Sequence, residues 1–322
     1  GERFRARGYK LPKPLIPVAG APMIEHVLDM YPEDLDTVFI VNENHLADPG
    51  FAMKETLLSL RPNARIAPIG SHKLGPSGAI SLASGYIDLD LPTVVNYCDF
   101  TCLWNFDGFA RKLMECDGVI ATYSGYHPHM ARTTKFAYVH GEGDRVSAIQ
   151  EKNSYTDQPM LERASSGTYG FASGAMLIEA TARQIVEDIS LGGEYYTSLT
   201  YLPLLEDGRD IRSYEIERFF QWGTPEDLDD FLVAHEAFQQ IPAVPPVHNK
   251  RHNSVLLAAG LGSRFAQEGY ETPKASLPLS GKPAWVQVAE ALHDDRQHVT
   301  VSREGTLDRE MASKLGKVVE VT

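Results

Sequence analysis

Two stretches of this sequence place an arginine, a lysine, glycines and an aromatic residue at the same spacing. Gly1-Glu2-Arg3-Phe4 leads to a Pro-Lys pair that ends at Lys13, and 261 positions later Gly262-Ser263-Arg264-Phe265 leads to the pair that ends at Lys274. Glycines let backbone N–H groups approach a phosphate chain. An arginine fork binds phosphoryl oxygens, and a lysine adds a compact charge. Because solvated charges need not recur in register, the repeat predicts that Arg3 and Lys13 hold nucleotide phosphates.

A carboxylate follows an apolar segment in the middle of the chain. Asp99 comes directly after Thr93-Val94-Val95-Asn96-Tyr97-Cys98, which we interpret as a buried strand. Ligands of open α/β sheets bind beyond the carboxyl ends of the strands, and carboxylate oxygen is a ligand that Mg²⁺ prefers. Asp99 is therefore a candidate metal ligand, although an aspartate that caps the following turn fits the same position.

Further polar groups stand at expected loops. Gly75-Pro76 opens a helix whose first N–H groups could face a base or a phosphate. Glu151-Lys152 ends a short strand, where an ordinary exposed ion pair is the alternative. Gly167 lies in Ser166-Gly167-Thr168-Tyr169-Gly170-Phe171, and Glu194 lies in Gly193-Glu194-Tyr195-Tyr196; these small and polar groups suit a polyol ligand.

Apolar runs alternate with helix-like segments through the first half of the chain. This alternation predicts an α/β fold with a mostly parallel, Rossmann-like sheet covered by helices on both faces. The expected strands are 37–42, 64–69, 93–98 and 118–123, and the expected helices are 51–60, 78–85 and 106–115. A hairpin (136–140 and 145–150) and helices near 175–188 and 225–239 follow.

The repeat also predicts how the chain is divided. We expect a nucleotide-binding domain over residues 1–238, a Pro-rich linker over 239–252 and a partial second copy over 253–322. The second copy has an apolar segment, 254–261, which reads as a buried strand before its glycine loop. The first copy starts at the glycine equivalent to Gly262, so its first strand is expected to be missing from the sequence.

Composition limits the classes of function. The chain has 322 residues, a net charge of −13 and only three cysteines. This charge argues against a broad nucleic-acid surface, and no apolar run approaches the roughly 20 residues that span a bilayer. The cysteines suggest neither a disulfide framework nor a zinc site. We expect a cytoplasmic protein that binds neither nucleic acid nor a membrane; its oligomeric state stays open.

In their order along residues 1–238, these motifs resemble those of the sugar-phosphate nucleotidyltransferases, or nucleoside-diphosphate-sugar pyrophosphorylases. The resemblance implies the nucleotidyltransferase fold, a nucleoside triphosphate and a phosphorylated acceptor as partners, and Mg²⁺ as cofactor. It implies these roles: Arg3, Lys13 and Lys152 in catalysis; Gly1, Gly75, Pro76 and Asn96 at the nucleotide; Glu151, Gly167 and Glu194 at the acceptor; and Asp99 at the metal.

One departure stands out. The family often carries a second metal-binding aspartate two residues before the glycine of a Gly-Thr-Pro motif, and this chain has Gln221 there.

The expected reaction joins an NTP to a phosphorylated acceptor, by default a sugar 1-phosphate, and releases pyrophosphate. The alternatives are a sugar-nucleotide-dependent glycosyltransferase and a non-catalytic nucleotide-binding protein.

Overall fold

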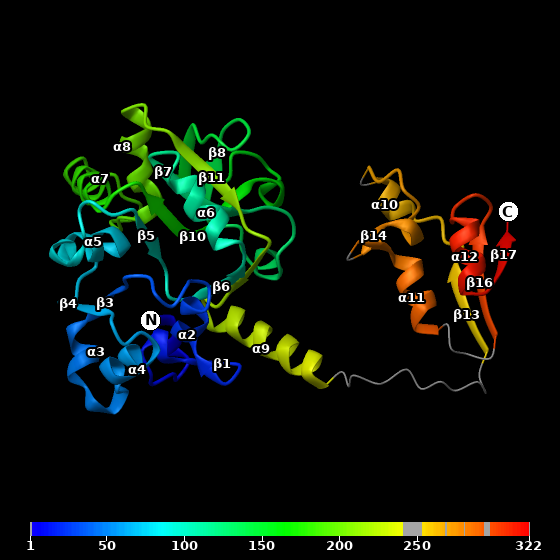
Figure 1. The fold of residues 1–322 in the computed structure, drawn as a ribbon, viewed down its shortest axis with the longest axis horizontal. Coiled ribbons are helices and arrows are strands. Elements are labelled where there is room, and N and C mark those ends of the chain that lie inside the picture. Colours follow the sequence, from blue (N-terminus) through cyan, green and yellow to red (C-terminus); the bar gives the residue numbers. More distant parts are fainter. Residues whose placement is uncertain (1, 241–252, 268, 280, 293–296, 322) are drawn as a thin grey trace. The chain divides into compact units, whose positions relative to one another are not determined.

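The computed structural model describes residues 2–240, 253–267, 269–279, 281–292 and 297–321. The chain divides into two compact units, Gly1–Phe238 and Gln239–Thr322, here called unit 1 and unit 2 (Figure 1). Most of the expected linker, 241–252, and the expected nucleotide-binding residue Gly1 lie outside the described residues.

Unit 1 alternates helices and strands. Its helices are α1 (Glu2–Ala6), α2 (Met23–Leu28), α3 (Glu43–Ala47), α4 (Met53–Leu60), α5 (Gly75–Leu82), α6 (Phe106–Leu113), α7 (Gly174–Val186), α8 (Tyr201–Glu206) and α9 (Pro225–Gln240). Its strands are β1 (Pro17–Val18), β2 (Ala21–Pro22), β3 (Val38–Asn42), β4 (Arg65–Ile69), β5 (Thr93–Asn96), β6 (Phe100–Leu103), β7 (Gly118–Tyr123), β8 (Ala137–His140), β9 (Ala148–Glu151), β10 (Arg163–Phe171), β11 (Ile211–Glu215) and β12 (Arg218–Gln221).

The main sheet of unit 1 has the order β11-β7-β10-β8-β9, with β5 also paired to β10. β5 and β7 are both antiparallel to β10, and β11 is parallel to β7, so β5, β7 and β11 run in the same direction. β3 and β4 form a separate parallel pair. The predicted α/β fold with mostly parallel strands is confirmed, and β9 and β10 are the two strands of the main sheet that run in the opposite direction.

β7 shows how the sequence determines the centre of this fold. All its residues are buried, as expected of a strand covered on both faces. Val119 and Ala121 pack in one hydrophobic cluster with Phe109 of α6, whereas Ile120 packs in another with Leu177 of α7. The period-two alternation of β7 therefore divides its side chains between two helical layers.

The boundaries of α5 and α6 follow from local chemistry. The Asn105 side chain accepts a hydrogen bond from the Gly108 N–H, which caps α6, and Phe109 and Leu113 bury one helical face. α5 begins at Gly75, where the Gly75-Pro76 motif predicts a helix start, because Pro76 in its first turn has the backbone angle that a helix requires.

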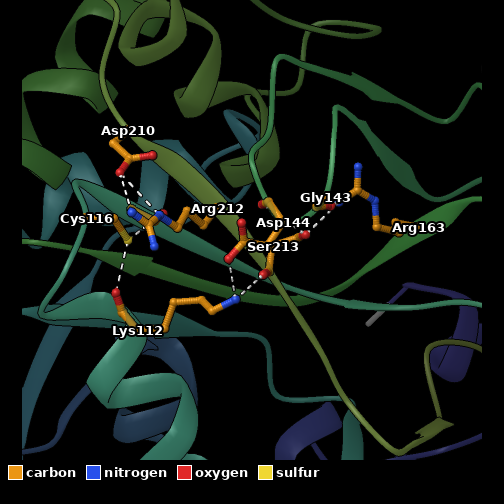
Figure 2. A network of polar contacts seen from close by, with 9 residues as sticks. Lys112, Cys116, Gly143, Asp144, Arg163, Asp210, Arg212 and Ser213 are labelled. Atoms are coloured by element: carbon orange, nitrogen blue, oxygen red, sulfur yellow. Dashed lines mark hydrogen bonds and ion pairs between the residues drawn. The ribbon is translucent and has the colours of Figure 1, made fainter.

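A polar network fixes the turn of the β8–β9 hairpin against β11 and α6 (Figure 2). Lys112 Nζ donates to Asp144 Oδ2 at 2.7 Å and to the Ser213 carbonyl at 3.2 Å. Arg163 donates to the Gly143 carbonyl at 2.8 Å, and Arg212 pairs with Asp210. These contacts hold the turn end of the hairpin, while its other end, where Ala137 pairs with Glu151, remains available to form a site.

Unit 2 contains a three-stranded parallel sheet of order β13-β16-β17. Its elements are β13 (Asn253–Ala258), α10 (Ser263–Gln267), β14 (Pro278–Leu279), β15 (Lys282–Pro283), α11 (Ala284–Leu292), β16 (Gln297–Arg303), α12 (Arg309–Leu315) and β17 (Lys317–Val321). The prediction that β13 is buried is wrong for one of its faces. Leu256 and Ala258 pack against Trp285, but Val255 is 59% and Leu257 is 78% exposed, because only one face of the strand meets a helix.

Both copies of the repeat form the same local structure. Each has a short helix, a 3-10 turn that starts at the repeated lysine, a two-stranded hairpin and a longer helix. Lys13 lies 5.4 Å from the Phe4 ring centroid, and Lys274 lies 5.6 Å from that of Phe265. The shared residues thus produce the same lysine–aromatic contact twice.

Two further observations concern the described residues as a whole. None of their helices is both long enough and apolar enough to cross a membrane. Cys98, Cys102 and Cys116 are free thiols.

Candidate active site

Lys13 and Asp99 meet although they are 86 residues apart in sequence. Lys13 Nζ donates to Asp99 Oδ2 at 2.5 Å and to the Gly223 carbonyl at 2.9 Å. Both side chains are mostly buried, with 17% and 25% exposed. Burial opposes the ammonium form, but the Asp99 charge and hydrogen bond raise the Lys13 pKa above its ordinary value. Lys13 is therefore a fixed cation at neutral pH.

Strand pairing brings these partners together. Phe100, at the start of β6, pairs antiparallel with Gln221, at the end of β12. The Trp222 N–H then donates to the Asp99 carbonyl at 2.8 Å. This pairing places Gly223 beside Asp99, so one lysine can contact both.

The N-terminal loop is held by its own small core. Phe4, Ile16 and Met23 are buried with Trp222 and Leu228, the latter on α9. Arg3 next to this core is exposed, and none of the ion pairs of the described residues includes it. The positive charge of Arg3 lowers the pKa of Lys13 and that of Tyr196, although other effects raise both. Arg3 therefore lies near both groups. A second cation thus stands close to the Lys13–Asp99 pair.

A second polar cluster forms where β9 ends. Lys152 has a left-handed backbone (φ 59°), and its Nζ contacts the Tyr196 hydroxyl and lies 4.1 Å from that ring's centroid. Tyr196 donates in turn to Glu194 Oε2 at 2.6 Å. Glu151 accepts a hydrogen bond from Ser198 at 2.6 Å. Burial raises the Glu151 pKa, and the Ser198 hydrogen bond and Lys152 charge partly offset that effect.

A cavity of about 180 Å³ connects the two clusters. Its walls include Asp99, Glu151 and Gly167, three residues that the sequence singled out. Gln221, Gly223 and Tyr196 also line it. The cavity therefore has Asp99 and Gly223, the two partners of Lys13, in its lining together with Glu151 and Tyr196.

The remaining expected residues lie around this centre. Gly75 has φ +77°, and a Cβ there would come within 2.9 Å of the Tyr195 nitrogen, so α5 begins directly against the loop of Glu194. Pro76 follows in the first turn of α5. Asn96 is turned inward: its Oδ1 accepts from Tyr31 at 2.7 Å and from Thr168. Asn96 thus supports the β5–β10 pairing in this structure.

Two residues near the cavity were given no role of their own from the sequence. Lys135, next to β8, lines the cavity, and Tyr196 links Lys152 to Glu194. Lys135 stands in no recognisable motif, so only the fold reveals it. Tyr196 belongs to the motif Gly193-Glu194-Tyr195-Tyr196 that the sequence singled out, but its contact with Lys152 was not predicted.

The groups around Asp99 offer oxygen ligands of the kind that Mg²⁺ binds. Mg²⁺ binds to one or two carboxylates, keeps several waters and takes further ligands from substrate phosphates. Asp99 supplies one carboxylate beside the Gly223 carbonyl. Gln221 donates through Nε2 to Asp227 at 3.0 Å, and Asp227 is also engaged with Thr224 at the start of α9. No cluster of three or more acidic, His or Cys ligands occurs among the described residues. A single-carboxylate Mg²⁺ site completed by a nucleotide fits this set.

The chain belongs to the nucleotidyl transferase family, because the model of that family matches residues 1–195, more than half of the sequence. The prediction from the motifs is confirmed at this level. Among curated proteins, the chain is 28% identical over 221 residues to the bifunctional protein GlmU of Exiguobacterium sibiricum. This match covers 68% of the chain. It is 22% identical over 221 residues to GlmU of Bacillus licheniformis. The matches span 46% of each of these relatives.

Solved structures agree on the fold. A nucleoside-diphosphate-sugar pyrophosphorylase from Vibrio cholerae superimposes with a TM-score of 0.60 at 21% identity, covering 72% of this chain and 96% of its own. A UDP-glucose pyrophosphorylase complexed with UDP-glucose gives a TM-score of 0.55 at 16% identity, covering 70% of this chain and 91% of its own. At these identities the likeness establishes the nucleotidyltransferase fold.

Proposed function

We propose that the chain joins a nucleoside triphosphate to a phosphorylated acceptor, a sugar 1-phosphate, and forms a nucleoside-diphosphate sugar and pyrophosphate. The observation that carries this proposal is that Asp99, which Lys13 contacts, lines one cavity with Glu151 and Gly167. Family membership and the likeness to pyrophosphorylases support the reaction class. The proposed roles of the individual residues rest on the site geometry and on the resemblance.

The reaction needs charge neutralisation more than proton transfer. An oxygen of the acceptor phosphate attacks the α-phosphorus in line, the bond from that phosphorus to the bridging oxygen breaks, and pyrophosphate leaves. The attacking oxygen is already anionic, so no protein base is needed. Arg3 and Lys13 hold the triphosphate, and Lys152 holds the acceptor phosphate.

The metal has a limited role in this proposal. Asp99, with the Gly223 carbonyl beside it, would hold Mg²⁺, and when bound this ion would neutralise phosphate charge. Lys13 would then exchange its contact with Asp99 for a phosphate oxygen. Glu151 and Glu194 accept hydrogen bonds from Ser198 and Tyr196, and in the proposal they accept sugar hydroxyls.

The test is a matrix of the four common NTPs against phosphorylated acceptors, with released pyrophosphate as the readout. We expect release only when both substrates and Mg²⁺ are present, loss of release on chelation, and recovery when Mg²⁺ is added back. Release of a nucleoside diphosphate from a sugar nucleotide would instead indicate a glycosyltransferase. NTP binding without any turnover across the matrix would indicate a non-catalytic nucleotide-binding protein.

A further inference from the structure

The loop that follows α7, residues 187–196, carries Glu194 and Tyr196 of the second polar cluster. It is called the acceptor loop below. Most of its residues are exposed to solvent, and its turn contains Gly192 and Gly193, which both have positive φ. Because glycines leave a backbone many conformations, contacts outside this turn must fix where the two polar side chains lie.

The end of α7 determines where the acceptor loop starts. Asp188 has a left-handed backbone with φ 53°, and its N–H donates to the Ile185 carbonyl at 3.2 Å. The Ile189 N–H donates to the Gln184 carbonyl at 2.9 Å. These two bonds form a Schellman motif, which satisfies carbonyls of the last helical turn. The first residues of the loop are thereby joined to Gln184.

The side chain of Gln184 reaches both the beginning and the end of the acceptor loop. This residue is 0% exposed. Its Nε2 donates to the Ile189 carbonyl at 3.2 Å and to the Tyr196 carbonyl at 2.9 Å. A primary amide has two N–H donors, so Gln184 uses both of them on the loop. A single buried side chain therefore connects the two ends.

The other end of this amide contributes little to stability. Gln184 Oε1 is buried and has no hydrogen-bond partner among the described residues. An unpartnered buried acceptor costs free energy, which offsets part of the gain from the two donated bonds. The geometry of the acceptor loop therefore explains this amide better than net stabilisation of the fold does.

A second contact holds the acceptor loop from the side of α5. The Tyr195 N–H donates to the Leu74 carbonyl at 2.9 Å, and the Ser77 N–H donates to the Tyr195 carbonyl at 2.9 Å. Gly75 and Pro76, the residues expected at the nucleotide, lie between these two partners in sequence. Two successive carbonyls of the loop are thus bound by two different helices, which fixes the direction of the chain at this point.

We propose that Gln184 is a positioning residue for the acceptor. By holding the Tyr196 carbonyl, Gln184 keeps the Tyr196 hydroxyl in contact with Lys152 and Glu194 and so sets the affinity for the phosphorylated acceptor. The inference rests on the proposed function, which places Lys152 and Glu194 at the acceptor. Gln184 acts through the loop, because it is fully buried and the described lining of the cavity does not include it.

The experiment compares Gln184→Met with Thr181→Val in the full chain. Methionine has the length and approximate volume of glutamine but donates no hydrogen bond. Thr181→Val is the matched control, because Thr181 is 1% exposed on the same helix and its Oγ1 has no hydrogen-bond partner among the described residues. Pyrophosphate release is measured while either the acceptor or the NTP is varied, and amide hydrogen exchange is followed over residues 189–196.

We expect Gln184→Met to raise the acceptor KM roughly tenfold or more and to leave the NTP KM within about threefold of the parent. Exchange in the acceptor loop should become about tenfold faster in this variant alone. Thr181→Val should match the parent in all three measurements. A change confined to the acceptor side is a result that a general loss of folded protein does not give.

Equal changes in both KM values, a lower rate with both KM values unchanged, or unchanged exchange in the loop each overturn the proposal. If Gln184→Met does not fold, Gln184→Asn replaces it, since an amide one methylene shorter cannot span both carbonyls, and the same outcomes decide. A parent without turnover overturns the proposed function and this inference together. An active parent whose acceptor KM the Gln184 variant retains overturns this inference alone.

Discussion

At the scale of single residues, the central feature is a lysine that two partners hold in place. Lys13 contacts Asp99 and the Gly223 carbonyl, and it lies beside Phe4. Such preorganised cations stabilise charge that develops in a transition state without reorganising first. The types and order of these residues were predicted from the sequence. Their mutual distances follow from the pairing of β6 with β12.

Lys13→Ala and Asp99→Ala should each slow turnover by about 100-fold or more, on the order of 3 kcal/mol in the barrier, because each removes one preorganised electrostatic group. Steady-state pyrophosphate release measures the effect. Lys112→Ala is the matched control, since it breaks a Lys–Asp ion pair of the same kind at the turn end of the hairpin (Figure 2). Turnover within about threefold of the parent for Lys13→Ala or Asp99→Ala would remove that residue from the mechanism.

A buried histidine makes stability depend on pH. His129 is 6% exposed, and its Nε2 lies 2.9 Å from the Tyr123 hydroxyl. Burial, reinforced by the neighbouring His127, lowers the His129 pKa from 6.5 to about 4. The folded state therefore resists protonation that the unfolded chain accepts. This stabilisation is complete above pH 6.5 and is lost as the pH falls toward 4.

Urea unfolding between pH 7.5 and pH 4 should accordingly show the unfolding free energy of unit 1 declining, with His129 contributing at most about 3 kcal/mol. His129→Gln should flatten part of this decline. An unchanged slope in His129→Gln would contradict the assignment.

At the scale of elements, β10 joins the two walls of the site. Its register on β7 shifts between Ser165 and Tyr169. Gly167 lies within this irregularity with φ +97°, and a Cβ there would approach the Tyr97 ring to 3.1 Å. The sequence singled out Gly167 in its motif, but it did not predict the nearby Tyr97 ring that requires a glycine there. That contact joins β10 to a residue 70 positions earlier, beyond the range of any local pattern.

Gly167→Ala should destabilise the chain by roughly 1–3 kcal/mol, because it combines an unfavourable backbone angle with contacts to Tyr97 and Phe100. Chemical denaturation measures the loss. Gly85→Ala is the control, since a Cβ at Gly85 meets no atom within 4 Å and the residue has no positive φ. Equal stability of the two variants would show that the bulge tolerates a side chain.

At the scale of the whole molecule, the two units contain separate buried clusters. Phe109 is fully buried in a cluster of unit 1, and Trp285 is 3% exposed in the cluster of unit 2. The domain division expected from the repeat, 1–238 and 253–322, remains a proposal. Its consequence is that each unit should unfold in its own cooperative transition.

Differential scanning calorimetry should therefore resolve two transitions. Phe109→Ala and Trp285→Ala each remove a large core side chain at a cost of about 3–5 kcal/mol. Each variant should lower the midpoint of one transition by roughly 10 °C and leave the other unchanged. A single transition that both variants shift would show that the two units unfold together.

The sequence by itself determined the class of the protein, the order of its elements and the cations and carboxylates of the candidate site. These features depend on the residue types and on the spacing of residues that are close in sequence. Both act locally, through backbone preferences and through the period of the hydrophobic residues. Tertiary structure alone decided that Lys13 meets Asp99, that Lys135 and Tyr196 join the cavity, and that one face of β13 is exposed. Those outcomes depend on which distant strands pair and which helix covers them, and no short stretch of sequence carries that information.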